Sequence, residues 1–362
     1  MARLSALDSS HLALIGSCAV MSAPKYDEQQ AMTKRIRPEA TPIPHGISST
    51  PRSIVDAHMH LYDSRAVRYG VFEHRNPTFE ALVGDYSRLP RTYGLDDYLG
   101  ATRLRDVSGV VWHEFIAEDT LGELAWAQQL AASAPLPMAF VGLVDFAEPG
   151  LQRRLEAYRE VRGLSAVRQH LGWDEKAPLR RMAARPDFMR DPDWLKGLGV
   201  LEGLDLRCGL ELFAPQLPDL LAVVRAHPEI GFTIAVMGWP TDRGANGFSR
   251  WRSDMLALGR CDNTCASISA VECIFGLNWS EAEIRPWILA VIEAFGPARC
   301  MFGSHLPIDG LSYGFDRLYD AYERIVSGFS DDEKDAIFRG TAAAWFRIPQ
   351  LRQDGVGVVG AQ

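Results

Sequence analysis

The feature that most constrains the fold is a regular alternation of short apolar runs with helical patterns. About eight such runs, rich in β-branched and apolar residues, follow one another between residues 54 and 303. They are Ile54–Ala57, Ser108–Trp112, Met138–Val144, Leu164–Arg168, Arg207–Leu212, Gly231–Met237, Thr264–Ser269 and Arg299–Gly303. Eight repeated strand–helix units predict an α/β fold, the closed (β/α)8 TIM barrel. A doubly wound open sheet is the alternative, but no glycine-rich phosphate loop follows the first run.

Helical patterns with readable boundaries separate the runs. Helices are expected over Leu121–Ala132, Leu151–Val161, Pro215–Ala226 and Ile288–Phe295, and a capping box opens a last helix over Ser330–Trp345.

Two segments lack this periodicity. Leu61–Arg105, directly after the first run, has many charged and aromatic residues, and we expect an irregular insertion that forms a lid or one wall of a pocket. Asp242–Arg252 is also expected to be an irregular loop. Together these two segments would determine which substrate the pocket accepts.

The two ends of the chain differ from its centre. Leu12–Met21 is a short apolar run that faintly resembles a lipoprotein signal, and Pro38–Pro51 has the composition of a linker. Because only Arg3 is basic before this run and Asp8 intervenes, the alternative is a disordered leader or a start site assigned too early. We expect a leader and linker over residues 1–52, a catalytic barrel over 53–348 and a flexible tail over 349–362.

Charge and cysteine content narrow the class of protein. The formal net charge is -8 and the pI is about 5.6, which argues against binding to nucleic acid or to an anionic membrane. The 6 cysteines form no CxxC pair, as expected for reduced thiols in a cytoplasmic protein. No apolar run is long enough to span a membrane. The expected partners are a small-molecule substrate and further copies of the chain.

Side chains able to do chemistry follow almost every apolar run. In a parallel barrel the carboxyl ends of the strands share one face, which carries the active site. His58 and His60 would point the same way from one strand, about 6–7 Å apart, and can share one divalent metal. Later runs lead to His113, Glu114, Asp145, Arg168, His170, Glu211, Ser269, Glu272, His305 and Asp309. This density predicts an active site.

The fourth run supplies two candidates for catalysis. Arg168 can bind a substrate carboxylate with two hydrogen bonds, or it can pair with a barrel acid such as Asp145 or Glu211. Glu211 lies in an apolar strand and needs a partner such as Arg168 in either case. His170 can polarise the substrate carbonyl.

The remaining candidates also have structural alternatives. His113 and Glu114 can bind substrate or orient a ligand, or they can be a solvated pair. Trp239 can form a pocket wall or simply pack. His305 can be a metal ligand or a general base, since the unperturbed imidazole pKa lies near 6.5, or it can cap the last strand through hydrogen bonds.

Three stretches resemble the amidohydrolase-related branch of the amidohydrolase superfamily. They are Val55–Leu61, Ala166–Arg168 and Arg299–Asp309, and the resemblance extends over residues 53 to 348. This branch contains metal-dependent barrel hydrolases, including sugar lactonases, pyrone-dicarboxylate lactonases and sulfolactone hydrolases. The resemblance implies hydrolysis of a lactone or similar ester-like bond, here in a small carboxylated substrate, with a metal held partly by the His-x-His pair.

The chain departs from the family pattern at two positions. His305 stands where the family usually has an aspartate, and Val236 and Met237 occupy a stretch that often carries a histidine. The loss of a carboxylate and an imidazole argues against a two-metal centre. We expect one divalent metal, zinc or manganese, on His58, His60 and His305, or a metal-free mechanism as in some lactonases of this branch.

Two other functions fit the same residues. A related branch of the superfamily uses a similar His-x-His metal to decarboxylate aromatic or enol acids. A degenerate barrel that binds a small molecule without turnover is the second alternative, because the family aspartate is missing.

Overall fold

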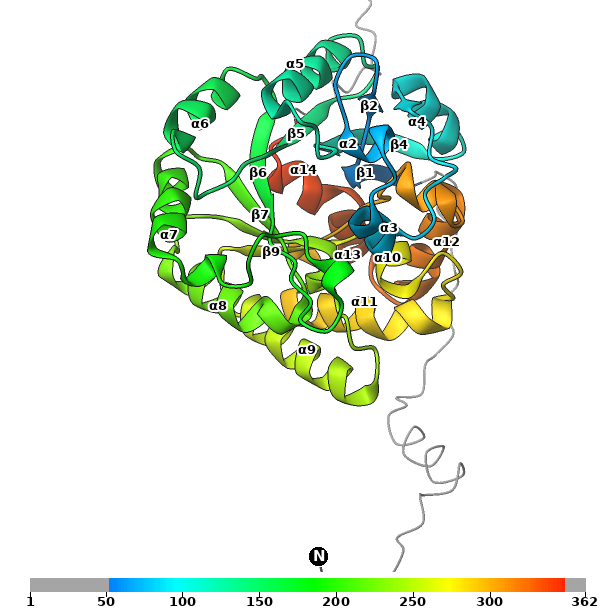
Figure 1. The fold of residues 1–362 in the computed structure, drawn as a ribbon. Coiled ribbons are helices and arrows are strands. Elements are labelled where there is room, and N and C mark those ends of the chain that lie inside the picture. Colours follow the sequence, from blue (N-terminus) through cyan, green and yellow to red (C-terminus); the bar gives the residue numbers. More distant parts are fainter. Residues whose placement is uncertain (1–51, 349–362) are drawn as a thin grey trace, which may run out of the picture. The chain divides into compact units, whose positions relative to one another are not determined.

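The strands of the computed structural model, which describes residues 52–348, form a parallel barrel surrounded by helices (Figure 1). The eight strands are β1 (Ser53–Met59), β4 (Asp106–His113), β5 (Met138–Leu143), β6 (Leu164–His170), β7 (Arg207–Glu211), β8 (Phe232–Ile234), β9 (Thr264–Ile268) and β10 (Cys300–Phe302). They pair in this order and all in parallel. The predicted (β/α)8 barrel is confirmed. The expectations for residues 1–51 and 349–362 lie outside the described residues.

Helices form the outer layer, where their apolar faces cover the strands. They are α5 (Thr120–Ala131), α6 (Leu151–Arg159), α7 (Pro192–Gly199), α8 (Leu217–Ala226), α9 (Ala245–Gly259), α11 (Glu281–Phe295) and α12 (Phe315–Ile325). The short helix α10 (Val271–Phe275) lies at the open end of the barrel instead. Helix α12 shows the pattern clearly, since Leu318, Tyr319 and Tyr322 are fully buried on one side. Among residues 52–348, no helix combines the length and the apolar character that a membrane crossing requires.

The insertion after β1 is more regular than the sequence indicated. Residues 61–105 contain β2 (Tyr62–Asp63), α2 (Gly70–Glu73), α3 (Pro77–Val83), β3 (Thr92–Tyr93) and α4 (Leu95–Thr102). The prediction of an irregular segment was therefore wrong, because helices of one or two turns are too short to show a periodicity. The predicted role as a pocket wall holds, since α3 supplies three apolar residues to the pocket described below.

Two further boundaries differ from the prediction. Asp242–Arg252 is not a loop, because α9 begins at Ala245 and buries Trp251 and Met255 on its inner face. Strand β8 ends at Ile234, three residues before the apolar run does. The turn that follows holds Val236 and Met237 at φ values of 50° and 52°, which a strand cannot accommodate.

One end of the barrel is closed by the end of the described chain. The chain continues through α13 (Asp331–Asp335) and a π-helical turn into α14 (Thr341–Trp345). Ala342, Phe346 and Ile348 then pack with small interior residues of the strands, including Ala57 and Ala166. Because this segment contacts the strand starts, it leaves only the opposite end open to a substrate.

The barrel closes between β1 and the residues that follow β10. The backbone N–H of His305 donates to the carbonyl of His58 at 2.6 Å, and that of His60 donates to Leu306 at 2.8 Å. Behind them, the buried Asp56 carboxylate accepts hydrogen bonds from the Ser304 backbone N–H at 2.7 Å and hydroxyl at 2.6 Å. Burial raises the pKa of Asp56 to about 6 in spite of these bonds. This closure fixes the positions of all three histidines.

Gly303 is required for this close approach. A Cβ atom there would lie 2.7 Å from His58 Cβ and 2.8 Å from His58 N. We expect Gly303→Ala to lower the free energy of unfolding by about 1–3 kcal/mol, the usual cost of overpacking. Gly100→Ala is the control, because a Cβ at this position in α4 meets nothing within 4 Å. Urea unfolding of both variants measures the difference, and equal stability would contradict the packing argument.

Candidate active site

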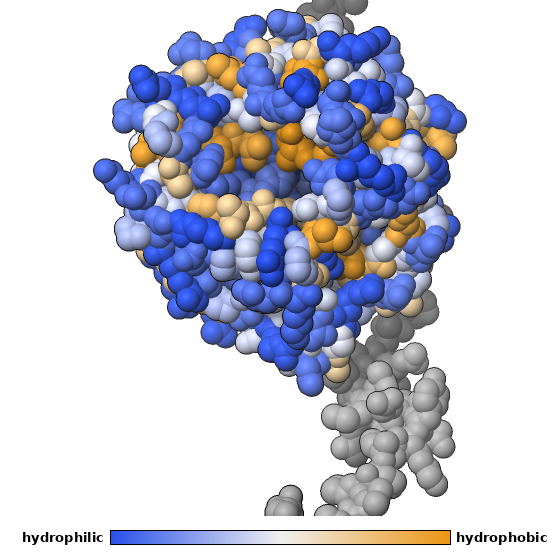
Figure 2. Space-filling view, viewed as in Figure 1, coloured by the Kyte–Doolittle hydropathy of each residue, from blue (hydrophilic) through white to orange (hydrophobic). Residues whose placement is uncertain are grey.

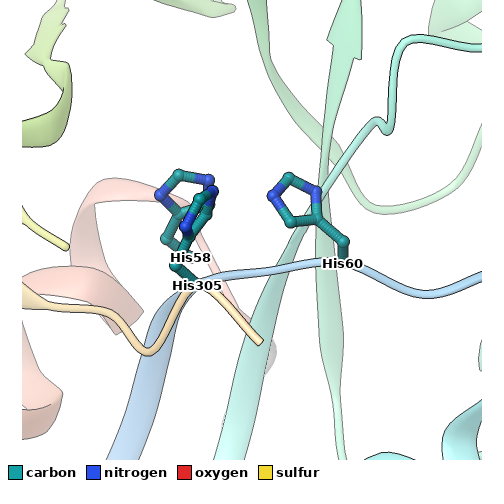
Figure 3. A group of neighbouring side chains, drawn as sticks. All are labelled: His58, His60 and His305. Carbon is teal, nitrogen blue, oxygen red and sulfur yellow. The ribbon is translucent and has the colours of Figure 1, made fainter. Parts of the chain in front are cut away.

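Three imidazoles from opposite ends of the barrel sequence meet at the open end. His58 and His60 come from the end of β1, and His305 comes from the segment after β10. One ring nitrogen from each lies within 4.8 Å of the other two. The ring centroids are 5.1 Å apart for His58 and His60, and 4.7 Å apart for His58 and His305. Figure 3 shows the ring of His60 facing the other two.

Each of these rings is oriented by a hydrogen bond at Nδ1. His58 Nδ1 lies 2.8 Å from the Ser269 hydroxyl, and His305 Nδ1 bonds to Glu272. His60 Nδ1 donates to the backbone carbonyl of His113 at 3.0 Å. The nitrogen left without a partner is therefore Nε2, and that of His58 is buried. Metal-binding histidines are held in this way by a partner at the other ring nitrogen.

Burial keeps the first two imidazoles neutral. It lowers the pKa of His58 well below the ordinary value, with the neighbouring His113 ring adding to the effect. It lowers the pKa of His60 in the same direction, with His305 as the next cause. A neutral imidazole has a lone pair for a metal, whereas an imidazolium does not. The three residues predicted as metal ligands are thus brought together, and the donor set suits a divalent ion.

A pocket of about 190 Å³ opens beside this cluster (Figure 2). His60 and His305 line it, and Phe79, Leu82 and Val83 of α3 form an apolar wall. The other lining residues include Glu114, Phe115, Ile116, Arg168, His170, Met182, Glu211, Val236, Trp239, Ala270, Cys273 and Ile308. Trp239 therefore lies where the sequence predicted a pocket wall.

A buried network of charged groups forms the floor of the pocket. Arg168 Nε donates to Glu114 Oε1 at 2.6 Å, and another guanidinium nitrogen donates to Glu211 at 3.2 Å. The expected pairing of Glu211 with Arg168 is confirmed. His170 Nε2 lies 2.8 Å from the same Glu114 oxygen. Burial would raise the pKa of Glu114, but the Arg168 charge and the bond to His170 together lower it below the usual range.

Strained backbone is concentrated around the pocket. Ile116, Val236, Trp239, Ala270 and His305 all have positive φ, between 29° and 61°, and all five line the pocket. Left-handed backbone costs a residue with a β-carbon about 1 kcal/mol or more, and β-branched side chains rarely adopt it. Such strain clusters at functional sites, where the surrounding structure must hold it in place.

The structure places His113 away from the pocket. Its Nε2 lies 3.1 Å from the carbonyl of Ala57, and its ring lies behind that of His58, 4.2 Å away. Its ring faces the barrel interior because alternate residues of a strand point to opposite faces. His113 lines only a small internal cavity that it shares with His58. Its predicted contact with substrate thus lacks support in the geometry.

The sequence alone assigned no role to three residues that the structure places in the site. Ser269 and Glu272 were recognised only as groups at a strand end, although they orient His58 and His305. Cys273 was interpreted only as a reduced thiol, but it lines the pocket with its Sγ 3.9 Å from His305 Nδ1. Their position directly after β9 was the available signal, but the partners that give each a role lie elsewhere in the sequence.

The fold is a parallel barrel, and the three imidazoles that converge at its open end are a donor set able to hold a divalent metal. A family model described as "Amidohydrolase" (Amidohydro_2) matches residues 55–348. The chain therefore belongs to the amidohydrolase family and is an enzyme of hydrolase type.

The chain is also similar to individual proteins over most of its length. The chain is 27% identical over 306 residues to an L-fucono-1,5-lactonase of Burkholderia multivorans, which covers 82% of this chain and 96% of the relative. An uncharacterized protein y4mH of Sinorhizobium fredii is 28% identical over 298 residues, covering 82% and 99%. A crystal structure of an amidohydrolase from Burkholderia multivorans with bound zinc has a TM-score of 0.68 at 23% identity, covering 82% and 99%.

Glu123 connects the end of β4 to its outer helix and makes stability depend on pH. Its Oε1 accepts from the Phe115 backbone N–H at 2.8 Å. Burial, followed by the nearby Glu114 charge, raises its pKa well above the ordinary value. Between the unfolded and folded pKa values, rising pH removes a proton only from the unfolded chain. The free energy of unfolding therefore falls as pH rises through that window.

We expect Glu123→Gln to flatten this pH dependence, because glutamine keeps the acceptor and has no proton to lose. The variant should be at least as stable as the wild type at neutral pH. Urea unfolding between acid and neutral pH tests this, with Glu156→Gln as the exposed control that leaves the slope unchanged. An unchanged slope in Glu123→Gln would show that this residue is ionised in the folded protein.

Proposed function

We propose that the protein hydrolyses a lactone or similar ester-like bond of a small molecule, using one divalent metal, zinc or manganese. The observation that carries this proposal is the convergence of His58, His60 and His305 at the edge of a 190 Å³ pocket. Membership of the amidohydrolase family and the L-fucono-1,5-lactonase relative support the choice of bond.

The three histidines fit a metal by their own chemistry. Their Nδ1 atoms are occupied, and the buried Nε2 of His58 lacks a hydrogen-bond partner, which is costly unless a ligand completes it. When bound, a divalent ion polarises a carbonyl oxygen and lowers the pKa of a coordinated water to about 7. His305 is thus assigned as a ligand and not as the general base, since its Nδ1 is held by Glu272.

We assign proton transfer to His170. Glu114 is ionised because its pKa is lowered, so it can only accept a hydrogen bond. The hydrogen bond to Glu114 therefore requires a proton on His170 Nε2, which leaves Nδ1 as the basic atom of the neutral ring. From the pocket wall, Nδ1 can accept a proton from the attacking water and return it to the ring oxygen as the lactone opens.

Arg168 holds this assembly together. Besides its bonds to the two glutamate side chains, it donates to the Glu114 backbone carbonyl at 3.0 Å. With two carboxylates already on one guanidinium, its role in binding a substrate carboxylate stays a prediction. A substrate panel should therefore include both carboxylated and uncharged lactones.

We expect turnover of at least one lactone in a panel of aldonolactones, muconolactones and pyrones, measured by acid release. Replacement of His170 by Asn should reduce kcat by about 10²–10⁴-fold, the usual contribution of a general acid–base group. His227→Asn is a matched control, because His227 forms a similar pair with Glu202 at 2.8 Å outside the pocket. Release of carbon dioxide without ring opening would favour a decarboxylase, and binding without turnover a degenerate barrel.

We also expect zinc or manganese to raise the melting temperature of the metal-free protein. An ion at 100 times its Kd stabilises the folded state by about 2.7 kcal/mol. His60→Asn should abolish most of the shift that manganese produces, whereas His74→Asn, an exposed position in the insertion, should preserve it. Differential scanning calorimetry with and without metal gives the measurement. The same shift in all three proteins would place the ion outside the cluster.

A further inference from the structure

A second group of metal-binding atoms lies on the other side of the His305 ring. Glu272 and Cys273 lie in the first turn of helix α10, shortly after β9, and face the same ring nitrogen. Cys273 Sγ lies 3.9 Å from His305 Nδ1 and 3.6 Å from Glu272 Oε1. Ligands at 2.0–2.3 Å around a tetrahedral zinc are about 3.4–3.6 Å apart. Cys273 Sγ is therefore spaced from each of the other two atoms nearly as one zinc ligand is from the next. His305 Nδ1 and Glu272 Oε1 are hydrogen-bonded to each other, and an ion at this position would separate them by displacing the proton that they share.

The charge around this group also favours a cation. Glu272 is 2% exposed, and its second oxygen has no hydrogen-bond partner. Asp309 is fully buried nearby, with neither carboxylate oxygen bonded. Among residues 52–348, no lysine or arginine forms an ion pair with Glu272, Asp309 or Asp56. Arg168 is committed to Glu114 and Glu211 instead. Among the described residues, His305 is the only basic side chain that pairs with any of these buried acids. A divalent cation would balance their charge.

We propose that Cys273, Glu272 and His305 form a second metal position, selective for a thiophilic divalent ion such as zinc. The thiolate is the distinguishing ligand, because soft sulfur favours zinc over magnesium or manganese. Coordination would release two protons to solvent, one from the Cys273 thiol and one from the hydrogen bond between His305 Nδ1 and Glu272. The Nε2 atom of His305 stays available to an ion held by His58 and His60. With both positions filled, His305 would bridge them as an imidazolate. Metal binding at this position does not require that the protein hydrolyse a lactone.

Cobalt(II) gives a direct readout, since a thiolate ligand produces a sulfur-to-cobalt charge-transfer band in the near ultraviolet. The metal-free protein is titrated with cobalt and followed by absorption. We expect the band in the wild type and in His60→Asn, which leaves the second position intact. Cys273→Ser should lose the band and bind cobalt there at least 10-fold more weakly, which is the loss that removal of only an outer-shell partner already causes. Cys261→Ser, a half-buried cysteine on the outer layer, should preserve it.

A second measurement needs no variant. Zinc should protect Cys273 from alkylation by iodoacetamide, while Cys261 in the same sample reacts at an unchanged rate, as measured by peptide mass spectrometry. Circular dichroism establishes that each variant is folded. Absence of the band at saturating cobalt, its persistence in Cys273→Ser, or failure of zinc to protect Cys273 would each overturn the proposal.

Discussion

The closure of the barrel between β1 and the segment after β10 is the constraint on which the rest of the site depends. Two backbone hydrogen bonds, between His305 and His58 and between His60 and Leu306, join the first and last functional segments side by side. Gly303 permits this approach because it has no side chain, and Asp56 fixes Ser304 from behind. A shift of either segment would separate the imidazoles.

The buried ionisable groups fall into two sets with different chemistry. On one side of the pocket, Arg168 compensates two carboxylates, so Glu114 stays ionised and can orient His170. On the other side, Asp56 and Asp309 have no basic partner among the described residues, and burial raises both pKa values. The first set suits proton transfer, and the second would gain most from a bound cation.

An imidazole at position 305, where the sequence resemblance implies an aspartate, has a physical consequence for metal binding. A neutral imidazole brings no charge to the ion, so its orientation must come from a neighbour, and Glu272 supplies that carboxylate one shell away. The other departure is at Val236 and Met237, two apolar residues with left-handed backbone. The resemblance implies a histidine in this stretch.

The sequence by itself determined the eight strands, the closed parallel barrel and the open end at which the histidines gather. It could do so because buried parallel strands are continuous apolar runs, and the face at which they end follows from their direction alone. The sequence did not reveal the helices of the insertion, because helices of one or two turns are too short to show a periodicity. Only the tertiary structure decided what each polar group does. His113 turns inward, Arg168 is shared by two acids, and Ser269 and Glu272 orient imidazoles that lie 211 and 33 residues away in the chain. Such pairings arise when the barrel closes, and no local pattern of residues specifies them.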